Sequence, residues 1–295
     1  MFAPARLPLR LALAALVVAA LPVAARAASS FSIKVSLSAA MSGNVTPGDL
    51  PGFPVTITRA GTYELNGNLD LRSQPTPWNV NAIQVTADDV TLDLTGFNLI
   101  GPTTCNGRPL VCTPAGGTGD GISSSNRNIT VMNGTIRGMG DDGIVLNDNA
   151  IIRNVRAISN GGDGVAVDDV SLVEGCTVSA NGDQGIQMGQ GSIARGNTVS
   201  DNHQEGINAV QGSLISGNAV FRNDDDAIQV SGAATITNNT VAGHASHFGL
   251  NLGAGSGYGE NVLRDNNGPV GNNNPQVTGG MQIGINVCGT DTVCP

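Results

Sequence analysis

The sequence of 295 residues has few aromatic side chains and almost no lysine: it contains one Trp, two Tyr, six Phe and a single lysine, Lys34. Protein surfaces that bind sugars usually present aromatic rings on which the apolar faces of the sugar stack. The composition therefore does not favour a simple lectin-like module. Basic residues are also scarce, 14 against 23 acidic residues, and this balance argues against a nucleic-acid partner.

The sequence also lacks the 3.6-residue hydrophobic period of amphipathic helices, and its N-terminal apolar run is too short to span a membrane comfortably. That run, from Leu11 to about Leu21, follows Arg6 and Arg10 and precedes a small-x-small motif at residues 25–27. This order predicts a signal peptide over residues 1–27, cleaved near Ala27. Its removal takes three arginines and leaves 11 basic and 23 acidic side chains, a net charge of −12. We therefore expect a secreted or periplasmic protein whose mature chain has no transmembrane segment.

A repeated phrase of glycine, aspartate and alternating apolar residues dominates residues 119–268. One glycine of this phrase recurs at steps of 21 or 22 residues, with a single alanine in the series: Gly121, Gly143, Gly164, Gly185, Gly206, Ala227 and Gly249. Apolar residues follow it at alternating positions, and two further apolar columns keep the same period. The pattern predicts three short strands per repeat, joined by Gly, Asn and Asp turns. Such a unit buries its apolar face only by stacking on its neighbours.

Over roughly residues 80–268, this spacing resembles the right-handed parallel β-helix family, which has the pectin-lyase-like fold. The resemblance implies an all-β protein: a single-stranded right-handed parallel β-helix, or solenoid, of about eight coils with 21–22 residues per coil, capped at both ends. We expect an N-terminal β cap over residues 28–79, the β-helix over 80–268, and a C-terminal cap or tail over 269–295. The step of 39 residues that ends at Gly121 predicts an insertion at about residues 101–118.

Five cysteines fit an oxidising compartment. Cys105 and Cys112 both lie in the insertion, and Cys288 and Cys294 both lie in the C-terminal tail, so we expect two short-loop disulfides. Cys176 is left over. Asparagine takes its place in the following repeats, so we expect a buried, structural thiol there.

Asparagine recurs with the period of the repeat, and one histidine falls in the series: Asn160, Asn181, Asn202, Asn223, His244 and Asn266. Stacked side-chain amides hydrogen-bond along the axis of a coil and satisfy turn backbone groups that strand pairing leaves open. We therefore expect a structural asparagine ladder at one turn.

Acidic residues stand before the recurring glycine in most repeats. The column consists of Asp120, Asp142, Asp163, Glu205 and Asp226, interrupted by Gln184. Carboxylates one strand spacing apart repel each other, which raises a pKa or recruits a cation. On this basis Asp142 and Asp163 are candidate ligands for calcium, and no other cofactor is indicated. The alternative is that aspartate recurs here because tight turns favour it.

Three consecutive repeats combine acidic residues with all three histidines of the chain: HQEGINAV at 203–210, RNDDDAIQV at 222–230 and VAGHASHFGLNL at 241–252. Their order resembles that of polygalacturonase-type glycoside hydrolases, in which acidic residues on successive coils precede a Gly-His turn. The resemblance implies catalytic roles for Glu205, Asp225, Asp226 and His244. The Arg-x-Lys that follows in that family is missing, because Arg264 has no lysine two residues later. A glycosidase still needs only two suitably spaced carboxyl groups.

Four amide side chains are expected to face outward from the first strand of consecutive repeats: Gln187, Asn208, Gln229 and Asn251. Amides beside carboxylates can hydrogen-bond sugar hydroxyls. These four residues and His247 are therefore candidate substrate-binding residues. The alternative is that an exposed sheet face must be polar in any case.

Two functional hypotheses follow. The first is a secreted protein that engages polysaccharide along its elongated face, with weak glycoside hydrolase or polysaccharide lyase activity as an open question. The second is a non-catalytic structural or adhesion rod at the cell surface. The uniform coils favour the second, because family enzymes build their clefts from several long loops and this sequence has one. The sequence leaves the oligomeric state open.

Overall fold

In the computed structural model the chain divides into two units, Met1–Ser30 and Phe31–Pro295. The structure describes residues 32–244, 246–268, 274–289 and 294, all of which lie in the second unit. The predicted signal peptide and part of the predicted C-terminal tail lie outside the described residues. Where the chain is described, it contains no helix with the length and apolar character needed to cross a membrane.

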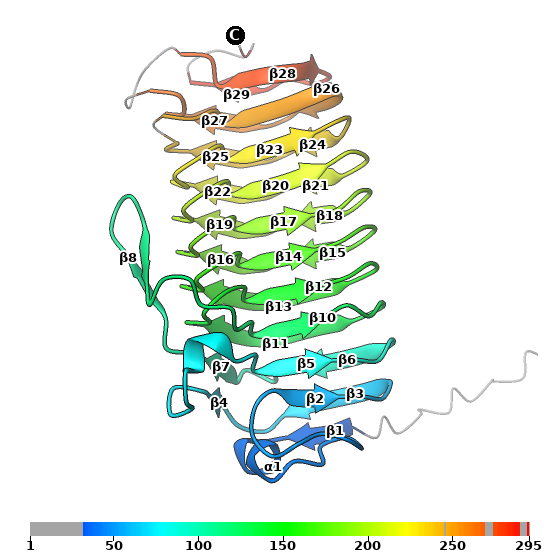
Figure 1. Ribbon diagram of the computed structural model, residues 1–295. Helices are drawn as coiled ribbons and strands as arrows, with labels where there is room; N and C mark the ends of the chain where they lie inside the picture. Colours follow the sequence, from blue (N-terminus) through cyan, green and yellow to red (C-terminus); the bar gives the residue numbers. More distant parts are fainter. Residues whose placement is uncertain (1–31, 245, 269–273, 290–293, 295) are drawn as a thin grey trace, which may run out of the picture. The chain divides into compact units, whose positions relative to one another are not determined.

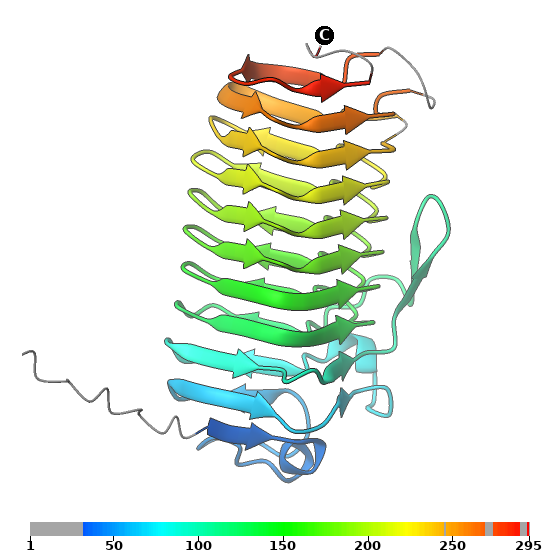
Figure 2. The ribbon, with the colours of Figure 1, turned by 180° about the vertical axis from the view of Figure 1, so that it is seen from behind.

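The second unit is a stack of coils in which every full coil contributes strands to three sheet faces (Figures 1 and 2). Within the stack, each inner strand pairs in parallel with the equivalent strand of the coil before and of the coil after, and the end strands pair on one side. The first face, which carries the candidate site, consists of β2 (Val55–Ile57), β5 (Ile83–Val85), β10 (Ile122–Ser124), β12 (Ile144–Leu146), β14 (Val165–Val167), β17 (Ile186–Met188), β20 (Ile207–Val210), β23 (Ile228–Ser231) and the first residues of β26 (Leu250–Gly259) and β28 (Val277–Gln282).

Two further faces complete the coils, and some long strands bend from one face into the next. The second face consists of β1 (Ser32–Val35), β3 (Gly61–Leu65), β6 (Val90–Asp93), the first part of β11 (Thr130–Arg137) and of β13 (Ile151–Ile158), β15 (Leu172–Glu174), β18 (Ile193–Arg195), β21 (Leu214–Ser216), β24 (Thr235–Thr237) and the ends of β26 and β28. The third face consists of β4 (Leu69–Asp70), β7 (Asn98–Ile100), the ends of β11 and β13, β16 (Thr177–Ser179), β19 (Thr198–Ser200), β22 (Ala219–Phe221), β25 (Thr240–Ala242), β27 (Val262–Arg264) and β29 (Val287–Cys288).

The core is one column of aliphatic side chains that runs through all the coils. On the first face, Ile122, Ile144, Val165, Ile186, Ile207, Ile228 and Leu250 lie directly above one another and are fully buried. The intervening side chain of each strand points outward, as the alternation of the sequence predicts. The single-stranded parallel β-helix predicted from the repeat is therefore confirmed.

The stack extends beyond both ends of the regular repeat. Eight coils lie between residues 80 and 268, as expected, but β2 pairs with β5 at a step of 28 residues and β26 pairs with β28 at a step of 27. Residues 28–79, expected as a cap, thus contribute β1 to β4 to the stack. The short helix α1 (Leu37–Ser42) lies at the N-terminal end of the coils (Figure 1). A 3₁₀ turn, η1 (Pro77–Asn79), lies in the long connection before β5.

Two asparagine ladders hold the corners of the coils. The expected ladder is present: the side-chain amide of Asn181 donates to Oδ1 of Asn202 at 2.9 Å, and Asn202 donates to Asn223 at the same distance. A second ladder of Asn197, Asn218, Asn239, Asn261 and Asn286 has the same geometry, with 3.0 Å between consecutive side chains. Every amide in these ladders is buried, so the side chains satisfy turn backbone that no strand pairs with.

The insertion forms a β-hairpin of β8 (Thr104–Asn106) and β9 (Val111–Thr113). Both expected disulfides are confirmed: one joins Cys105 to Cys112 across the hairpin, and the other joins Cys288 to Cys294. Cys176 is a free, buried thiol, as predicted.

Candidate functional site

The acidic column lies at the corner that precedes the first face. From Asp142 onward, the backbone carbonyl of each residue in the column accepts the N–H of the recurring glycine of the preceding coil, for example Gly185 N–H to Glu205 O at 2.9 Å. A side chain at Gly185 would collide with the coils, since its Cβ would lie 2.4 Å from Val199 Cγ1 and 2.7 Å from Asn202 Nδ2. The corner therefore repeats with little variation, and the acidic side chains stack in register.

In the first half of the column, the carboxylates bind backbone N–H groups of the next coil. Oδ1 of Asp142 accepts the N–H of Asp163 at 2.6 Å, and Oδ1 of Asp163 accepts the N–H of Gln184 at 2.8 Å. Burial, followed by the charges of neighbouring aspartates, raises the pKa of Asp142 to about 7 and the pKa of Asp163 to about 8. Among the described residues, neither belongs to a set of three converging metal-ligand side chains. Calcium binding by Asp142 and Asp163 stays a prediction.

The second half of the column has a different environment. Asp226 is held on both oxygens by the following coil: Oδ1 accepts the N–H of Phe248 and Oδ2 accepts the side-chain amide of Asn251, each at 2.7 Å. Glu205, one coil earlier, is 7% exposed, and its Oε2 is buried without a hydrogen-bond partner among the described residues. Burial first, and then the charges of Asp225 and Asp226, raise the pKa of Glu205. Glu205 thus lies on the coil directly before Asp225 and Asp226, and their charges act on its carboxyl group. A catalytic role for these three residues stays a prediction.

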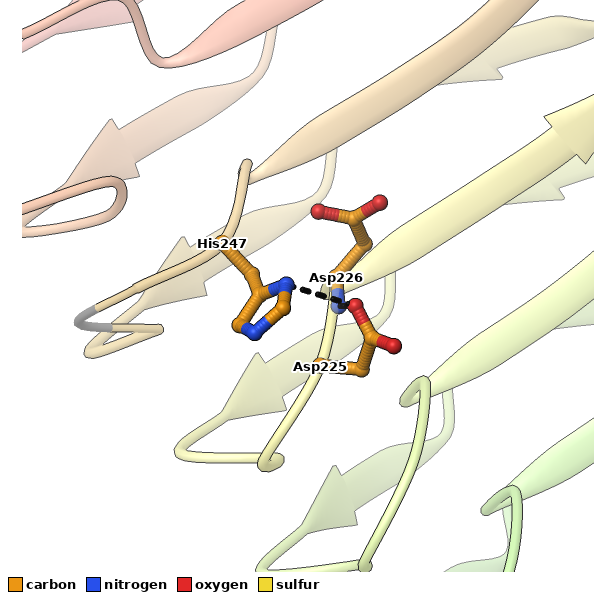
Figure 3. Close-up of side chains that lie close together, drawn as sticks. All are labelled: Asp225, Asp226 and His247. Atoms are coloured by element: carbon orange, nitrogen blue, oxygen red, sulfur yellow. Dashed lines mark hydrogen bonds and ion pairs between the residues drawn. The ribbon is translucent and has the colours of Figure 1, made fainter.

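His247 completes this group from the next coil. Its Nδ1 lies 2.7 Å from Oδ1 of Asp225, which also accepts the N–H of Asp226 at 2.8 Å. Figure 3 shows His247 and Asp225 joined across two neighbouring coils, with Asp226 beside them. One donor atom from each of the three residues lies within 4.8 Å of the others. We refer to Asp225, Asp226 and His247 as the Asp-Asp-His cluster.

The structure places His244, expected as a catalytic residue, inside the first asparagine ladder. It is 1% exposed, Nδ1 lies 2.9 Å from Oδ1 of Asn266, and Nε2 lies 3.2 Å from Nδ2 of Asn223. Burial lowers its pKa to about 4, which keeps the ring neutral. Both ring nitrogens are occupied and no face of the ring reaches the surface, so this position does not support contact with a substrate. The period of the asparagine series therefore accounts for the position of His244.

The four predicted amides lie in register on the first face. We call Gln187, Asn208, Gln229 and Asn251 the amide stripe. Gln187 is exposed and the other three are half-buried. The amides of Gln187, Asn208 and Gln229 make no hydrogen bond within the described part of the chain, whereas Asn251 is bonded to Asp226.

Two adjoining hollows lie along this face. One, of about 260 Å³, extends from Ser124 to Gln187, and the other, of about 450 Å³, extends from Val167 to Ser231. They share Val167, Asp168 and Gln187, so together they follow six consecutive strands. The strand spacing gives this surface a length of about 24 Å.

The hairpin forms a wall at the corner beside the acidic column. The sequence did not predict which coils it contacts. Arg108 forms an ion pair with Asp201 and donates to the carbonyl of Arg222 at 2.8 Å, and the N–H of Leu110 donates to Asp224 at 3.1 Å. The hairpin thus crosses several coils and reaches the coil of the Asp-Asp-His cluster. The sequence showed where the hairpin starts but carried no signal for the coils on which it rests.

Comparison with known proteins supports this architecture. A family model described as "Right handed beta helix region" matches residues 120–292, which is more than half of the chain. The chain belongs to the right-handed β-helix family. No curated protein sequence matches it.

Solved structures similar to this β-helix protein include two alginate epimerases. The A-module of the mannuronan C-5 epimerase AlgE4 of Azotobacter vinelandii is 19% identical, with a TM-score of 0.52 over 83% of this chain and 70% of that chain. A mutant of the periplasmic alginate epimerase AlgG is 13% identical, with a TM-score of 0.53 over 87% of this chain and 73% of that chain. At these identities the similarity is one of fold.

Proposed function

We propose that this β-helix protein binds a neutral polysaccharide along its first face, with the sugar chain parallel to the axis of the stack. The observation that carries the proposal is the amide stripe: Gln187, Asn208 and Gln229 lie in register in two adjoining hollows and leave their amide groups unbonded within the described residues. Each amide offers two donors and one acceptor oxygen, which matches the mixed donor and acceptor character of sugar hydroxyls.

The repeat of the fold suits a repeating ligand. Adjacent strands are about 4.8 Å apart, which is close to the length of one sugar unit in an extended 1,4-linked chain. Successive coils can therefore make the same contact with successive sugars. Since each hydrogen bond contributes about 1 kcal/mol and the lining residues include no aromatic ring for stacking, we expect weak binding per sugar and affinity that grows with chain length.

The charge of the first face favours neutral sugars over uronates. The outward positions of ten consecutive strands are all uncharged: Thr56, Gln84, Ser123, Val145, Ala166, Gln187, Asn208, Gln229, Asn251 and Thr278. The residues that line the hollows include Asp168 and no arginine or lysine. A polyuronate needs cationic partners for its carboxylates, and this face offers none. The same argument disfavours a lyase that acts on uronates.

Two stripe residues provide the test. The double variant Asn208→Ala/Gln229→Ala removes unbonded amides without touching the ladders. We expect it to bind a neutral β-1,4-linked polysaccharide about 10-fold less tightly, as measured by isothermal titration calorimetry. The matched control is Thr198→Ala/Thr240→Ala, two exposed positions on the third face, which should bind like the unmodified protein. Equal binding by all three proteins would overturn the proposal and favour the structural rod.

Hydrolysis of the bound chain is the second candidate function. Asn251, the last amide of the stripe, is hydrogen-bonded to Asp226, so the carboxylate of Asp226 adjoins the end of the stripe. Glu205 and Asp225 belong to the same corner of the stack, and the charges of Asp225 and Asp226 act on Glu205. Incubation with neutral polysaccharides should then release new reducing ends, and Asp226→Asn should abolish the release. Polysaccharide binding without release of new reducing ends would contradict hydrolysis and would identify the protein as a binding module.

We further propose that the protein works outside the cytoplasm. Two disulfides join Cys105 to Cys112 and Cys288 to Cys294, and bonds of this kind persist in oxidising compartments. Fractionation of cells that produce the full chain, followed by mass determination of the exported form, tests this together with the cleavage predicted near Ala27.

A further inference from the structure

The Asp-Asp-His cluster has the composition of a metal site. Asp225 and Asp226 come from the corner before β23 and His247 comes from the corner before β26, so two neighbouring coils supply the donors (Figure 3). One atom from each residue lies within 4.8 Å of the others. The ligand atoms of a tetrahedral zinc site are about 3.4 Å apart. The side chains of His247 and Asp225 are 40% and 41% exposed, so small rotations can close this difference.

An independent observation points to a cation at the same place. Within the described part of the chain, Oε2 of Glu205 is buried without a hydrogen-bond partner, and the residue is 7% exposed. The side chain of Gln184 donates toward the same carboxyl group but leaves this oxygen unbonded. The N–H of Gly206 donates to the carbonyl of Asp226 at 3.1 Å, so Glu205 lies on the coil directly before the cluster, and the charges of Asp225 and Asp226 act on its carboxyl group. Burial of an unpaired carboxylate oxygen next to two further carboxylates is unfavourable unless the group takes up a proton or a positive charge offsets it. A cation bound by the cluster supplies that charge.

The surroundings of Asp226 match the outer shell of a metal ligand. The N–H of Phe248 and the amide of Asn251 each donate to one oxygen of its carboxylate. Hydrogen bonds of this kind fix the orientation of ligating carboxylates. Each oxygen keeps a second lone pair for a metal.

The donor set selects the class of metal. Calcium and magnesium take oxygen ligands almost exclusively, whereas imidazole together with carboxylates suits first-row transition metals such as zinc or manganese. We propose that Asp225, Asp226 and His247 bind one divalent transition-metal ion, with Glu205 as a neighbouring carboxylate. In the metal-free protein, the 2.7 Å contact between Nδ1 of His247 and Oδ1 of Asp225 joins the two corners that the metal would join. The site clamps two consecutive corners, so metal binding also stabilises this part of the stack.

This site goes beyond polysaccharide binding and does not depend on it. It does bear on hydrolysis, because a metal that occupies Asp225 and Asp226 leaves these carboxylates unavailable as free acid and base. Metal and sugar titrations therefore test different surfaces: loss of the metal site should leave binding to Gln187, Asn208 and Gln229 unchanged, and loss of stripe amides should leave metal binding unchanged.

Titration with zinc tests the proposal on full-length protein that was purified with a histidine-free tag and treated with EDTA. We expect one zinc ion per chain by calorimetry, confirmed by elemental analysis after gel filtration, and a higher unfolding temperature with zinc. His247→Ala should weaken binding about 100-fold or more, as loss of a direct ligand exceeds loss of an outer-shell partner.

His203→Ala is the matched control. In the unmodified protein, the side chain of His203 is 43% exposed and its Nδ1 lies 3.5 Å from Oδ2 of Asp224. Among the described residues, His203 belongs to no set of three converging metal-ligand side chains. This variant should bind zinc like the unmodified protein. The absence of stoichiometric binding, or binding that survives both His247→Ala and Asp226→Asn in folded protein, would overturn the proposal.

Discussion

The side-chain amide of Asn251 donates a 2.7 Å hydrogen bond to Oδ2 of Asp226, and this bond joins the amide stripe to the acidic column. Asn251 lies on β26 and Asp226 lies one coil earlier, at the corner before β23. The amide group of Asn251 is thus used by the protein itself. Gln187, Asn208 and Gln229 remain as the stripe residues with amides free for a sugar, and the fourth predicted binding residue acts chiefly on the carboxylate.

This relationship predicts opposite effects for two amides of the same stripe. Asn251→Ala removes one of the two donors that orient Asp226, so we expect zinc affinity to fall about 10-fold while polysaccharide affinity changes little. Gln187→Ala should reduce polysaccharide affinity and leave zinc affinity unchanged. Separate calorimetric titrations of each variant measure both quantities, and parallel losses in the two variants would contradict the separation of the two surfaces.

His244 should make the stack sensitive to acid. Burial lowers its pKa from 6.5 to about 4. Between these pH values His244 is protonated in the unfolded chain but stays neutral in the folded protein. Stability is therefore lost as the pH falls, by up to about 3 kcal/mol for this residue. His244→Asn continues the ladder with a group that does not titrate. Its urea midpoint should depend less steeply on pH between 7 and 4.5, whereas an unchanged slope would show that the histidine is not the cause.

Asp163 should have the opposite pH effect. Its pKa is raised from 3.8 to about 8, so between these values the folded protein holds a proton that the unfolded chain releases, and stability is lost as the pH rises. Asp163→Asn keeps an oxygen for the N–H of Gln184 and removes the charge. We expect the variant to be more stable than the unmodified protein at pH 8, by about 2 kcal/mol or more, with a smaller difference at pH 4.

The same variant tests the predicted calcium site. If Asp142 and Asp163 bind calcium, then calcium should raise the unfolding temperature of the unmodified protein at pH 8 and have less effect on Asp163→Asn. No shift in either protein would remove this prediction.

The hairpin should depend on Arg108 for its position. Arg108→Ala removes the ion pair with Asp201 and the bond to the carbonyl of Arg222. We expect faster amide hydrogen exchange over residues 104–113, with a change in global stability of less than about 1 kcal/mol because the ion pair is exposed. Arg195→Ala, which breaks an exposed pair with Glu174 on the second face, is the control and should leave exchange in the hairpin unchanged.

The periodic part of the fold was predictable because equivalent positions of successive coils stack on one another and therefore require the same kind of side chain. Ile186 and Ile207 must be apolar, Gly185 must lack a side chain, and Asn202 must supply an amide, so every coil repeats the same signal. The coils that begin at Val55 and Val277 were not found, because extra residues in their turns make the steps 28 and 27. Periodicity also accounts for the position of His244, which continues the asparagine ladder although its Gly-His turn resembles an enzyme motif.

The candidate site was predictable only in part. Sequence order brought Glu205, Asp225 and Asp226 to neighbouring coils, since residues about 21 apart stack. The pairing of His247 with Asp225, and of Asn251 with Asp226, depends on side-chain direction at a corner whose step is 22, which periodicity does not fix. The coils that support the hairpin were hidden for a similar reason, because Arg108 contacts residues 93 and 114 positions away.

The most direct test of the central claim compares neutral and uronic-acid polysaccharides of equal length for binding to the same protein. Calorimetric titrations with a neutral β-1,4-glucan or mannan series and with oligomers of galacturonate or mannuronate should give measurable affinity only for the neutral chains, rising with length over about five sugars as the 24 Å surface fills. Preferential binding of the uronates, or affinity that Asn208→Ala/Gln229→Ala leaves intact, would contradict the account.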